Sequence, residues 1–370
     1  MKAKAIVSVI NDLVTDQRVD RNCRALIKCG YDVVLVGRVL KNSLPLPNRP
    51  YKTHRMRLVF TKGPLFYLEY QIRLFLFLLT HKAQLLFSND LDTLLPNYLI
   101  LKFRKSEIIY DTHELFCEVP ELIGNPSKRK IWKNIERSIF PKLKKLITVN
   151  QSIAEIYSEE YNVPVEYIRN IPLKRPHFEP LGREYLGLPK NKRIIILQGA
   201  GINIQRGAEE ALEAMQWVKN AVLLIVGSGD VIHQLKEMRI KLGLQNRVII
   251  TGKVPYELLA QYTQVADLGL SLDKDTNLNY RYSLPNKLFD YIYAGIPVFV
   301  SNLLEIARIV KNYEIGFIAE RHDPKYLAEH LNAIFENPQQ LALWKNNLKK
   351  AQKELNWDIE ERKLIRIIQD

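Results

Sequence analysis

Short runs of apolar, often β-branched residues alternate with amphipathic stretches along most of this 370-residue chain. The runs predict strands, because they are short, rich in Val, Ile and Leu, and bounded by Gly, Asp or Asn. They lie at residues 3–10, 32–38, 84–90, 107–113 and 144–150 in the first half, and at 193–201, 221–229, 247–254, 266–272 and 297–301 in the second. Their nearly continuous apolar character predicts parallel strands that are buried on both faces.

Stretches that predict helices lie between these strands, at residues 16–29, 207–218, 231–242, 255–263 and 285–294. Segment 173–193 interrupts the alternation and is rich in Pro, Gly and charge, as linkers are. We therefore predict an α/β protein of two doubly wound, Rossmann-like domains that face a central cleft. The expected domains span residues 1–172 and 173–340, and residues 341–370 are expected to be helical without a further strand.

The positive charge is concentrated in the first half of the chain. The net charge is +14, and residues 1–172 hold 27 Lys or Arg against 17 Asp or Glu. Two stretches, 49–82 and 126–145, mix this charge with Phe, Tyr and Trp, which suits the surface of an anionic membrane. A solvated basic face over core helices is the alternative. No nucleic-acid-binding motif accompanies the charge.

Cysteine content and the N-terminus favour a cytoplasmic protein. Cys23, Cys29 and Cys117 cannot all pair and have no metal-binding spacing, which fits free thiols in a reducing compartment. The first apolar run ends early, at Asn11 and Asp12, so it predicts a strand and not a signal peptide. Peripheral attachment to the inner face of the cell membrane stays open.

Two glycine-rich turns follow predicted strands of the second domain. "QGAGINIQRG" holds Gly199, Gly201 and Arg206, and "VGSGD" holds Gly227. Glycines let a phosphate approach the backbone, and the N–H groups at a helix N-terminus attract anions. Each turn by itself also fits a purely structural connection.

A third segment, "SLPNKLFDYIYAGIPV", predicts a helix that starts at Pro285. Lys287 projects from its first turn and Asp290 lies one turn further on. Together with Arg206, Lys287 would supply the positive potential that a diphosphate requires. The alternative is an ordinary surface salt bridge between Lys287 and Asp290.

Polar side chains also follow the predicted strands of the first domain. We expect them to lie at one edge of the sheet, and they are Asn11, Asp12, Asp90, Asp111, His113 and Glu114. Carboxylates beside His113 would fix its tautomer or raise its pKa. A zinc site at 111–114 is disfavoured, because no second ligand cluster accompanies it. Hydrolase-elbow, P-loop and zincin motifs are absent from the sequence.

Six segments, taken in their order along the chain, resemble the GT-B glycosyltransferases, most closely glycosyltransferase family 4. They are "NDLVTDQRVDRNCRAL", "DTHELF", "QGAGINIQRG", "VGSGD", "TGKVPYELLAQYTQVADLGLSL" and "SLPNKLFDYIYAGIPV". The resemblance covers residues 5–320. It implies transfer of a sugar from a nucleoside diphosphate sugar, by family frequency a UDP-sugar, with retention at the anomeric carbon and without a metal or other cofactor. The second domain would bind the donor and the first the acceptor, and helices in 341–370 would cross back to the first domain.

The resemblance also assigns roles to particular residues. Arg206 and Lys287 match cations at the donor diphosphate, with backbone N–H groups of the helix that begins near Ser283 and Asn286. Asp290 matches a carboxylate that binds the donor ribose. His113 matches a histidine that bonds a hydroxyl of the transferred sugar. These cations would stabilise the leaving diphosphate electrostatically.

Three positions depart from the family pattern. Tyr282 stands at the first glutamate of its paired motif, Ala200 stands near an expected arginine, and Asp290 is one methylene shorter than the usual glutamate. The expected acceptor is a saccharide or a lipid-linked molecule in bacterial cell-surface polysaccharide synthesis. Two alternatives stay open: a nucleotide-sugar 2-epimerase on the same fold, and a non-catalytic sugar-nucleotide-binding module.

Overall fold

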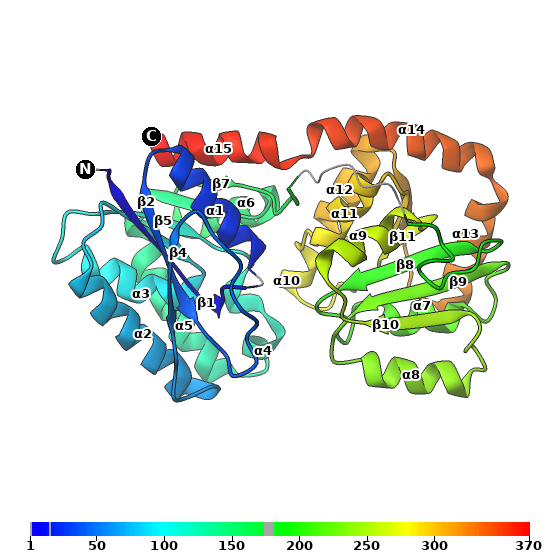
Figure 1. Cartoon of the computed structure of the whole chain (residues 1–370), viewed down its shortest axis with the longest axis horizontal. Coiled ribbons are helices and arrows are strands. Elements are labelled where there is room, and N and C mark those ends of the chain that lie inside the picture. The colour runs from blue at the N-terminus through cyan, green and yellow to red at the C-terminus, as the bar shows by residue number, and fades with distance from the viewer. Residues whose placement is uncertain (1, 15, 174–180) are drawn as a thin grey trace. The chain divides into compact units, whose positions relative to one another are not determined.

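The structure, a computed structural model, describes residues 2–14, 16–173 and 181–370. The chain divides into two compact units, Met1–Asn170 with Asp358–Asp370, and Ile171–Trp357. Each unit is built around a parallel sheet that carries helices on its faces (Figure 1). Residues 174–180 of the expected linker lie outside the described residues.

The sheet of the N-terminal unit has the strand order β3-β2-β1-β4-β5-β6-β7. Its strands are β1 (Lys4–Asp12), β2 (Asp32–Arg38), β3 (Lys52–Met56), β4 (Leu85–Asn89), β5 (Glu107–Asp111), β6 (Lys145–Thr148) and β7 (Val165–Tyr167). All five predicted strands are confirmed. β3 and β7 were not predicted from the sequence. Both are partly exposed edge strands, and neither contains a continuous apolar run.

Helices cover this sheet and include the last one in the chain. They are α1 (Gln17–Lys28), α2 (Gly63–Thr80), α3 (Leu91–Ile100), α4 (Pro120–Ile123), α5 (Pro126–Ile139), α6 (Gln151–Tyr161) and α15 (Trp357–Gln369). The buried carboxylate of Glu360 in α15 accepts a hydrogen bond from the Arg169 backbone N–H at 3.0 Å. From Asp358 onward the chain therefore belongs to the N-terminal unit.

The sheet of the C-terminal unit has the strand order β10-β9-β8-β11-β12-β13. The strands are β8 (Arg193–Gly199), β9 (Ala221–Gly227), β10 (Val248–Gly252), β11 (Leu268–Ser271), β12 (Val298–Ser301) and β13 (Gly316–Ala319), of which only β13 was not predicted. The helices are α7 (Ala208–Ala214), α8 (Ile232–Lys241), α9 (Tyr256–Gln264), α10 (Leu278–Arg281), α11 (Asn286–Ala294), α12 (Leu304–Tyr313), α13 (Pro324–Glu336) and α14 (Pro338–Glu354).

The strands of the C-terminal unit supply two hydrophobic cores, one on each face of the sheet. Along β8, Ile195 and Leu197 belong to one core, while Ile194 and Ile196 belong to the other. This follows from the alternation of side chains along a strand. Because both faces are covered, the strand has no polar face, which is why its sequence is continuously apolar.

Strand order reverses between β1 and β4 in one sheet, and between β8 and β11 in the other. At such a switch point the connections from neighbouring strands leave toward opposite faces of the sheet. The carboxyl ends of the strands there are left open to a ligand. The loops after β1 and β4, and after β8 and β11, are therefore the places to look for a site.

Candidate active site

Three segments of the C-terminal unit bring two cations to one buried carboxylate. Arg206 lies in the loop after β8, Asp273 lies two residues after the end of β11, and Lys287 lies in the first turn of α11. Arg206 Nη1 is 3.4 Å from Asp273 Oδ1, and Lys287 Nζ is 3.7 Å from Asp273 Oδ2. Each oxygen of Asp273 therefore faces one cation. The sequence indicated both cations but not Asp273, which no motif marked.

Local backbone geometry places Arg206 beside β11. The next residue, Gly207, has a φ of +74°, and a Cβ at this position would overlap the backbone of Leu272. Only glycine fits such a close left-handed turn. The guanidinium carbon of Arg206 also lies 4.8 Å from the ring centroid of Tyr280 in α10, within the range of a cation–π contact.

Helix α11 holds Lys287 in a largely buried position. Its side chain is only 10% exposed. Burial, together with the Arg206 cation, lowers the pKa of Lys287, while Asp273 acts in the opposite direction. Pro285 precedes α11, and among the described residues no side chain caps the helix N-terminus. Its first N–H groups therefore point beyond the helix toward the side where an anion would be stabilised.

Asp290 lies one turn further along α11 but does not pair with Lys287 in the described structure. Its carboxylate accepts a hydrogen bond from Gln198 Nε2 at 3.1 Å and one from the Tyr256 hydroxyl at 3.4 Å. Gln198 lies near the end of β8, so Asp290 also faces the switch point. The alternative interpretation of Lys287 and Asp290 as a surface salt bridge is wrong.

The structure shows a close-packing requirement at one glycine of these turns and open space at two others. A Cβ on Gly227 would overlap the carbonyl oxygen of Gly199, so Gly227 is needed for two loops to pack closely. Gly199 and Gly201 themselves have no atom closer than 3.7 Å to such a Cβ. Ser283 precedes α11 and Asn286 is its exposed first residue.

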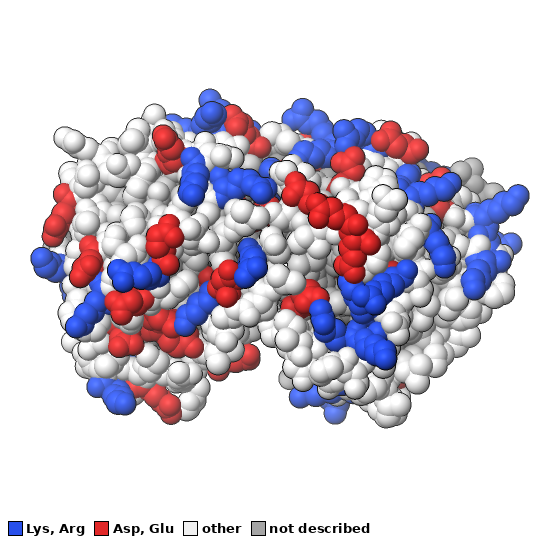
Figure 2. All heavy atoms as spheres, turned by 180° about the vertical axis from the view of Figure 1, so that it is seen from behind, with Lys and Arg blue, Asp and Glu red and all other residues white. Residues whose placement is uncertain are grey.

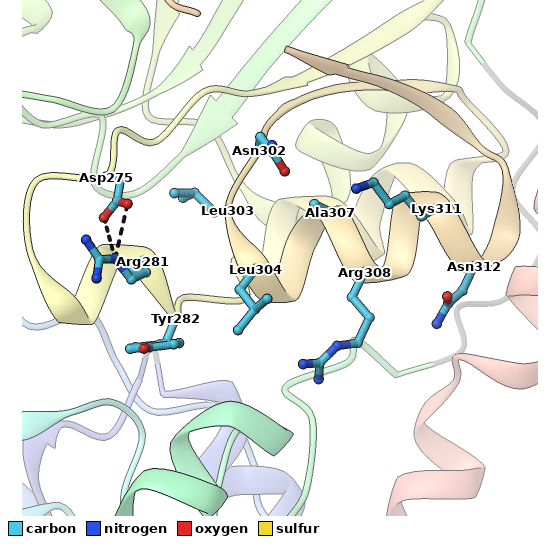
Figure 3. A pocket seen from close by; sticks show the side chains of 10 residues that line it. All are labelled: Asp275, Arg281, Tyr282, Asn302, Leu303, Leu304, Ala307, Arg308, Lys311 and Asn312. Atoms are coloured by element: carbon cyan, nitrogen blue, oxygen red, sulfur yellow. Dashed lines mark hydrogen bonds and ion pairs between the residues drawn. The ribbon is translucent and has the colours of Figure 1, made fainter. Parts of the chain in front are cut away.

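Tyr282, which stands where the resembled family has a carboxylate, lines a cavity of about 500 Å³ (Figure 3). α10, α12 and the segment after β12 form the cavity. Its remaining lining residues are Asp275, Arg281, Asn302, Leu303, Leu304, Ala307, Arg308, Lys311 and Asn312. Arg281 Nε donates to both oxygens of Asp275, at 2.9 and 3.1 Å. No motif in the sequence indicated this cavity.

In the N-terminal unit, His113 lies between two carboxylates. Its Nδ1 is 3.2 Å from Asp90 Oδ2 and its Nε2 is 3.6 Å from Asp111 Oδ2. Burial alone would lower the pKa of this imidazole, but the two carboxylates raise it to about 9. His113 is therefore a cation at neutral pH. The Asp90 carboxylate also accepts a hydrogen bond from the His113 backbone N–H at 2.8 Å.

Asp111 forms a second, fully buried ion pair with Arg18 of α1. Arg18 Nη2 is 2.6 Å from Asp111 Oδ1 and Arg18 Nε is 2.9 Å from Oδ2. Asn22 Nδ2 donates to the same carboxylate at 2.9 Å. Although burial acts in the opposite direction, Arg18 and His113 hold the pKa of Asp111 well below its usual range. Asp111 is thus a fixed anion beneath His113.

The other predicted residues of this unit are engaged elsewhere. Asn11 donates to Asp16 Oδ2 at 3.0 Å, and Asp12 accepts from Arg55 Nη2 at 2.9 Å. The Glu114 carbonyl oxygen accepts from the Thr112 hydroxyl at 2.8 Å. Asp90, Asp111 and His113 are therefore the predicted residues that the fold brings together. Within the described ranges, no group of three or more His, Cys, Asp or Glu is arranged to hold a metal ion.

Two family models match successive parts of the chain. "Glycosyltransferase Family 4" matches residues 17–173, and "Glycosyl transferases group 1" matches residues 183–351. An uncharacterized glycosyltransferase of Methanocaldococcus jannaschii is 23% identical over 227 residues, which span 58% of this chain and 56% of that relative.

Solved structures of similar architecture cover nearly the whole chain. Sucrose-phosphate synthase from Thermosynechococcus elongatus has a TM-score of 0.83 at 17% identity, over 100% of this chain and 98% of that one. WaaG, a glycosyltransferase involved in lipopolysaccharide biosynthesis, has a TM-score of 0.74 at 16% identity, over 98% and 99%. Anabaena HepE in complex with UDP-glucose has a TM-score of 0.73 at 13% identity, over 99% of each chain. The chain therefore belongs to the group 1 and family 4 glycosyltransferases, and it has the GT-B fold.

Proposed function

We propose that this protein transfers a hexosyl group from a UDP-sugar to a saccharide or lipid-linked acceptor in cell-surface polysaccharide synthesis. The observation that carries the proposal is the convergence of Arg206 and Lys287 on Asp273 at the β8/β11 switch point. Two cations on one carboxylate leave a net positive charge in a partly buried site. A diphosphate at this edge would meet both cations and the N–H groups of α11.

The proposed chemistry is electrostatic. When the bond between the sugar and the diphosphate breaks, negative charge grows on the leaving diphosphate. Arg206 and Lys287 are held in place before the reaction, so they stabilise this charge with little reorganisation. We propose that transfer occurs with retention at the anomeric carbon and that these fixed cations make a bound metal unnecessary.

Recognition of the nucleoside is proposed for Asp290. Gln198 and Tyr256 orient its carboxylate, which is an acceptor for ribose hydroxyl groups one helical turn from Lys287. UDP is the proposed nucleotide, since a structure of Anabaena HepE, which shares the fold, contains UDP-glucose. A role in surface polysaccharide synthesis is proposed from the similarity to WaaG.

In the N-terminal unit, the proposed sugar-binding residue is His113. Its Nε2 lies 3.4 Å from Asn89 Oδ1 and 3.6 Å from Asp111 Oδ2, distances longer than most N–H···O hydrogen bonds. We propose that a sugar hydroxyl accepts the Nε2 proton in place of these long contacts. We assign the acceptor to this unit, with Asp90 and Asp111 fixing the ring, and the donor to the C-terminal unit.

The test is a calorimetric titration of UDP and GDP without added metal, followed by product analysis with UDP-glucose and other UDP-sugars. Tight binding of UDP and transfer of the sugar to a saccharide or lipid-linked acceptor would support the proposal. Release of a 2-epimeric sugar without any acceptor would instead identify an epimerase. Binding of a nucleotide sugar without turnover under any acceptor condition would identify a binding module.

A further inference from the structure

Helix α2 carries a row of exposed apolar side chains along one face. Leu65, Leu68, Ile72 and Leu76 are 52%, 55%, 50% and 55% exposed. Because successive residues of an α-helix are rotated by about 100°, these four positions fall within about 80° of one another. They therefore form one continuous row along the helix.

The opposite face of α2 supplies the apolar side chains that pack into the core of this unit. Phe66, Tyr70, Leu74 and Leu78 are at most 6% exposed, and the helix packs beside α3 (Figure 1). An amphipathic surface helix requires only one apolar face to join a core. The outer row is thus an additional apolar face, turned away from the core of this unit.

The loop before α2 extends this row. The Glu69 carboxylate accepts hydrogen bonds from the backbone N–H groups of Val59 and Phe60, at 2.9 to 3.0 Å. These bonds hold the loop beside the helix, where the Val59 and Phe60 side chains are 75% and 43% exposed. We call the exposed apolar residues of this region the α2 patch: Val59, Phe60, Leu65, Leu68, Ile72 and Leu76. A contiguous exposed apolar patch of this kind marks an interaction surface.

Basic side chains lie at both ends of the α2 patch. Segments 57–82 and 101–106 hold seven Lys or Arg and one acidic residue, Glu69. That carboxylate is already engaged by backbone N–H groups and by Arg73. Lys62 precedes α2 and Lys82 follows it. Arg104 donates to the carbonyl oxygens of Leu78 and His81, so residues 102–105 lie at the C-terminal end of the helix.

An apolar row between basic ends matches the chemistry of an anionic bilayer surface. The apolar side chains would enter the boundary between headgroups and acyl chains, while Lys and Arg would reach the lipid phosphates. A protein partner would not require cations at both ends of the row. No helix in the described ranges is long and apolar enough to cross a membrane, so α2 would lie along the surface.

The second basic stretch of the sequence, which forms α5, does not share these properties. Trp132 is buried, Lys133 pairs with Glu136 and Glu160, and Arg129 pairs with Glu118. Lys and Arg also predominate over Asp and Glu on the face of the N-terminal unit that Figure 2 shows. Basic charge is therefore general to this unit, whereas the exposed apolar row is particular to α2.

We propose that the α2 patch docks this protein onto the surface of an anionic lipid bilayer. The proposal rests on the exposed row and its flanking charge and is independent of the donor site. Its direct test is flotation of the full-length protein with vesicles of phosphatidylglycerol and phosphatidylcholine, and with vesicles of phosphatidylcholine alone. The protein is expected to float with the anionic vesicles, more weakly as salt increases, and to remain unbound with the neutral ones.

The decisive variant is Leu68→Glu/Ile72→Glu, which places two carboxylates in the row at exposed positions. We expect at least about a tenfold loss of vesicle binding, because the change removes apolar contact and adds repulsion from anionic lipid. The matched control is Ile240→Glu/Leu343→Glu, which adds the same charge at exposed apolar positions of the C-terminal unit. It should bind vesicles as the unmodified protein does.

Three outcomes would overturn the proposal: no flotation of the unmodified protein, equal losses in both variants, or equal binding to neutral and anionic vesicles. Sedimentation velocity tests the other possible occupant of the α2 patch, a second copy of this chain. If the protein does not float but forms a concentration-dependent dimer that Leu68→Glu/Ile72→Glu abolishes, the α2 patch is a contact between two copies of this chain. A thermal unfolding profile equal to that of the unmodified protein would show that each variant is folded.

Discussion

The ammonium of Lys287 lies 3.7 Å from a carboxylate oxygen of Asp273, a residue of another loop, and not beside Asp290 on its own helix. Asp273 simultaneously faces Arg206 at 3.4 Å. One buried anion therefore keeps two cations close together. A nucleoside diphosphate would add a second anion to the same pair of cations.

Replacing Lys287 by Ala should weaken UDP binding about 10- to 100-fold, because one charge-assisted contact to the diphosphate is lost. Calorimetry without added metal measures this directly. The matched control is Lys349→Ala, at an exposed lysine of α14 in the same unit. Equal affinity of Lys287→Ala and Lys349→Ala for UDP would contradict a diphosphate site at α11.

Replacing Asp273 by Asn should destabilise the ligand-free protein while leaving UDP binding in place. Without this carboxylate, Arg206 and Lys287 repel each other, at a cost of about 1–3 kcal/mol. UDP would then take over the neutralising role of Asp273. The rise in Tm on saturation with UDP should therefore be larger in the variant than in the unmodified protein. Equal rises would mean that the diphosphate does not meet both cations.

If Asp290 binds the ribose, its charge should increase nucleotide affinity only when the ribose hydroxyl that it binds is present. The unmodified protein should bind UDP more tightly than 2′-deoxy-UDP or 3′-deoxy-UDP. Asp290→Asn should reduce the preference for UDP over at least one of these deoxy analogues by about tenfold. Competition binding with the three nucleotides measures the coupling. A preference that is fully retained in Asp290→Asn would assign ribose recognition to another group.

The raised pKa of His113 predicts a specific pH dependence of stability. Its folded-state pKa of about 9 lies above the ordinary 6.5, so protonation of His113 favours the folded state. This stabilisation is complete below about pH 6.5 and disappears as the pH rises through about 9. It amounts to about 3 kcal/mol at most, from about 1.4 kcal/mol per pKa unit.

Denaturant unfolding of the unmodified protein and of His113→Gln, from neutral to alkaline pH, tests this prediction. The difference in unfolding free energy between them should be largest at neutral pH and should shrink as the pH increases. A second variant, Asp90→Asn, should lower the pKa of His113, because it removes the largest favourable charge at the ring. A pH-independent difference would show that the imidazole is not held as a cation.

Local sequence predicted most of the fold because buried parallel strands are apolar on both faces and short. The apolar run at 193–201 predicted such a strand, and the structure has β8 at Arg193–Gly199. β3, with the sequence KTHRM, was missed because an edge strand with exposed side chains carries no such run. β13 was missed for a similar reason, since only one of its four residues is fully buried.

The candidate site was predicted only as far as motifs and strand ends could indicate it. Arg206, Lys287 and His113 were found because each follows a predicted strand or begins a helix. Asp273 follows a predicted strand too, but nothing local distinguishes it from an ordinary polar loop residue. Its role arises from the order of strands, which places the loop after β11 beside the loop after β8.

Local sequence therefore predicted most of the strands, the two-domain class, the family resemblance and the residue types at the strand ends. Tertiary structure decided which of those residues meet: Asp273 with Arg206 and Lys287, and His113 with Asp90 and Asp111. It also decided that α2, and not α5, exposes an apolar row. Periodicity depends on neighbours along the chain, whereas charge pairing and exposure depend on strand order and packing between segments far apart in sequence.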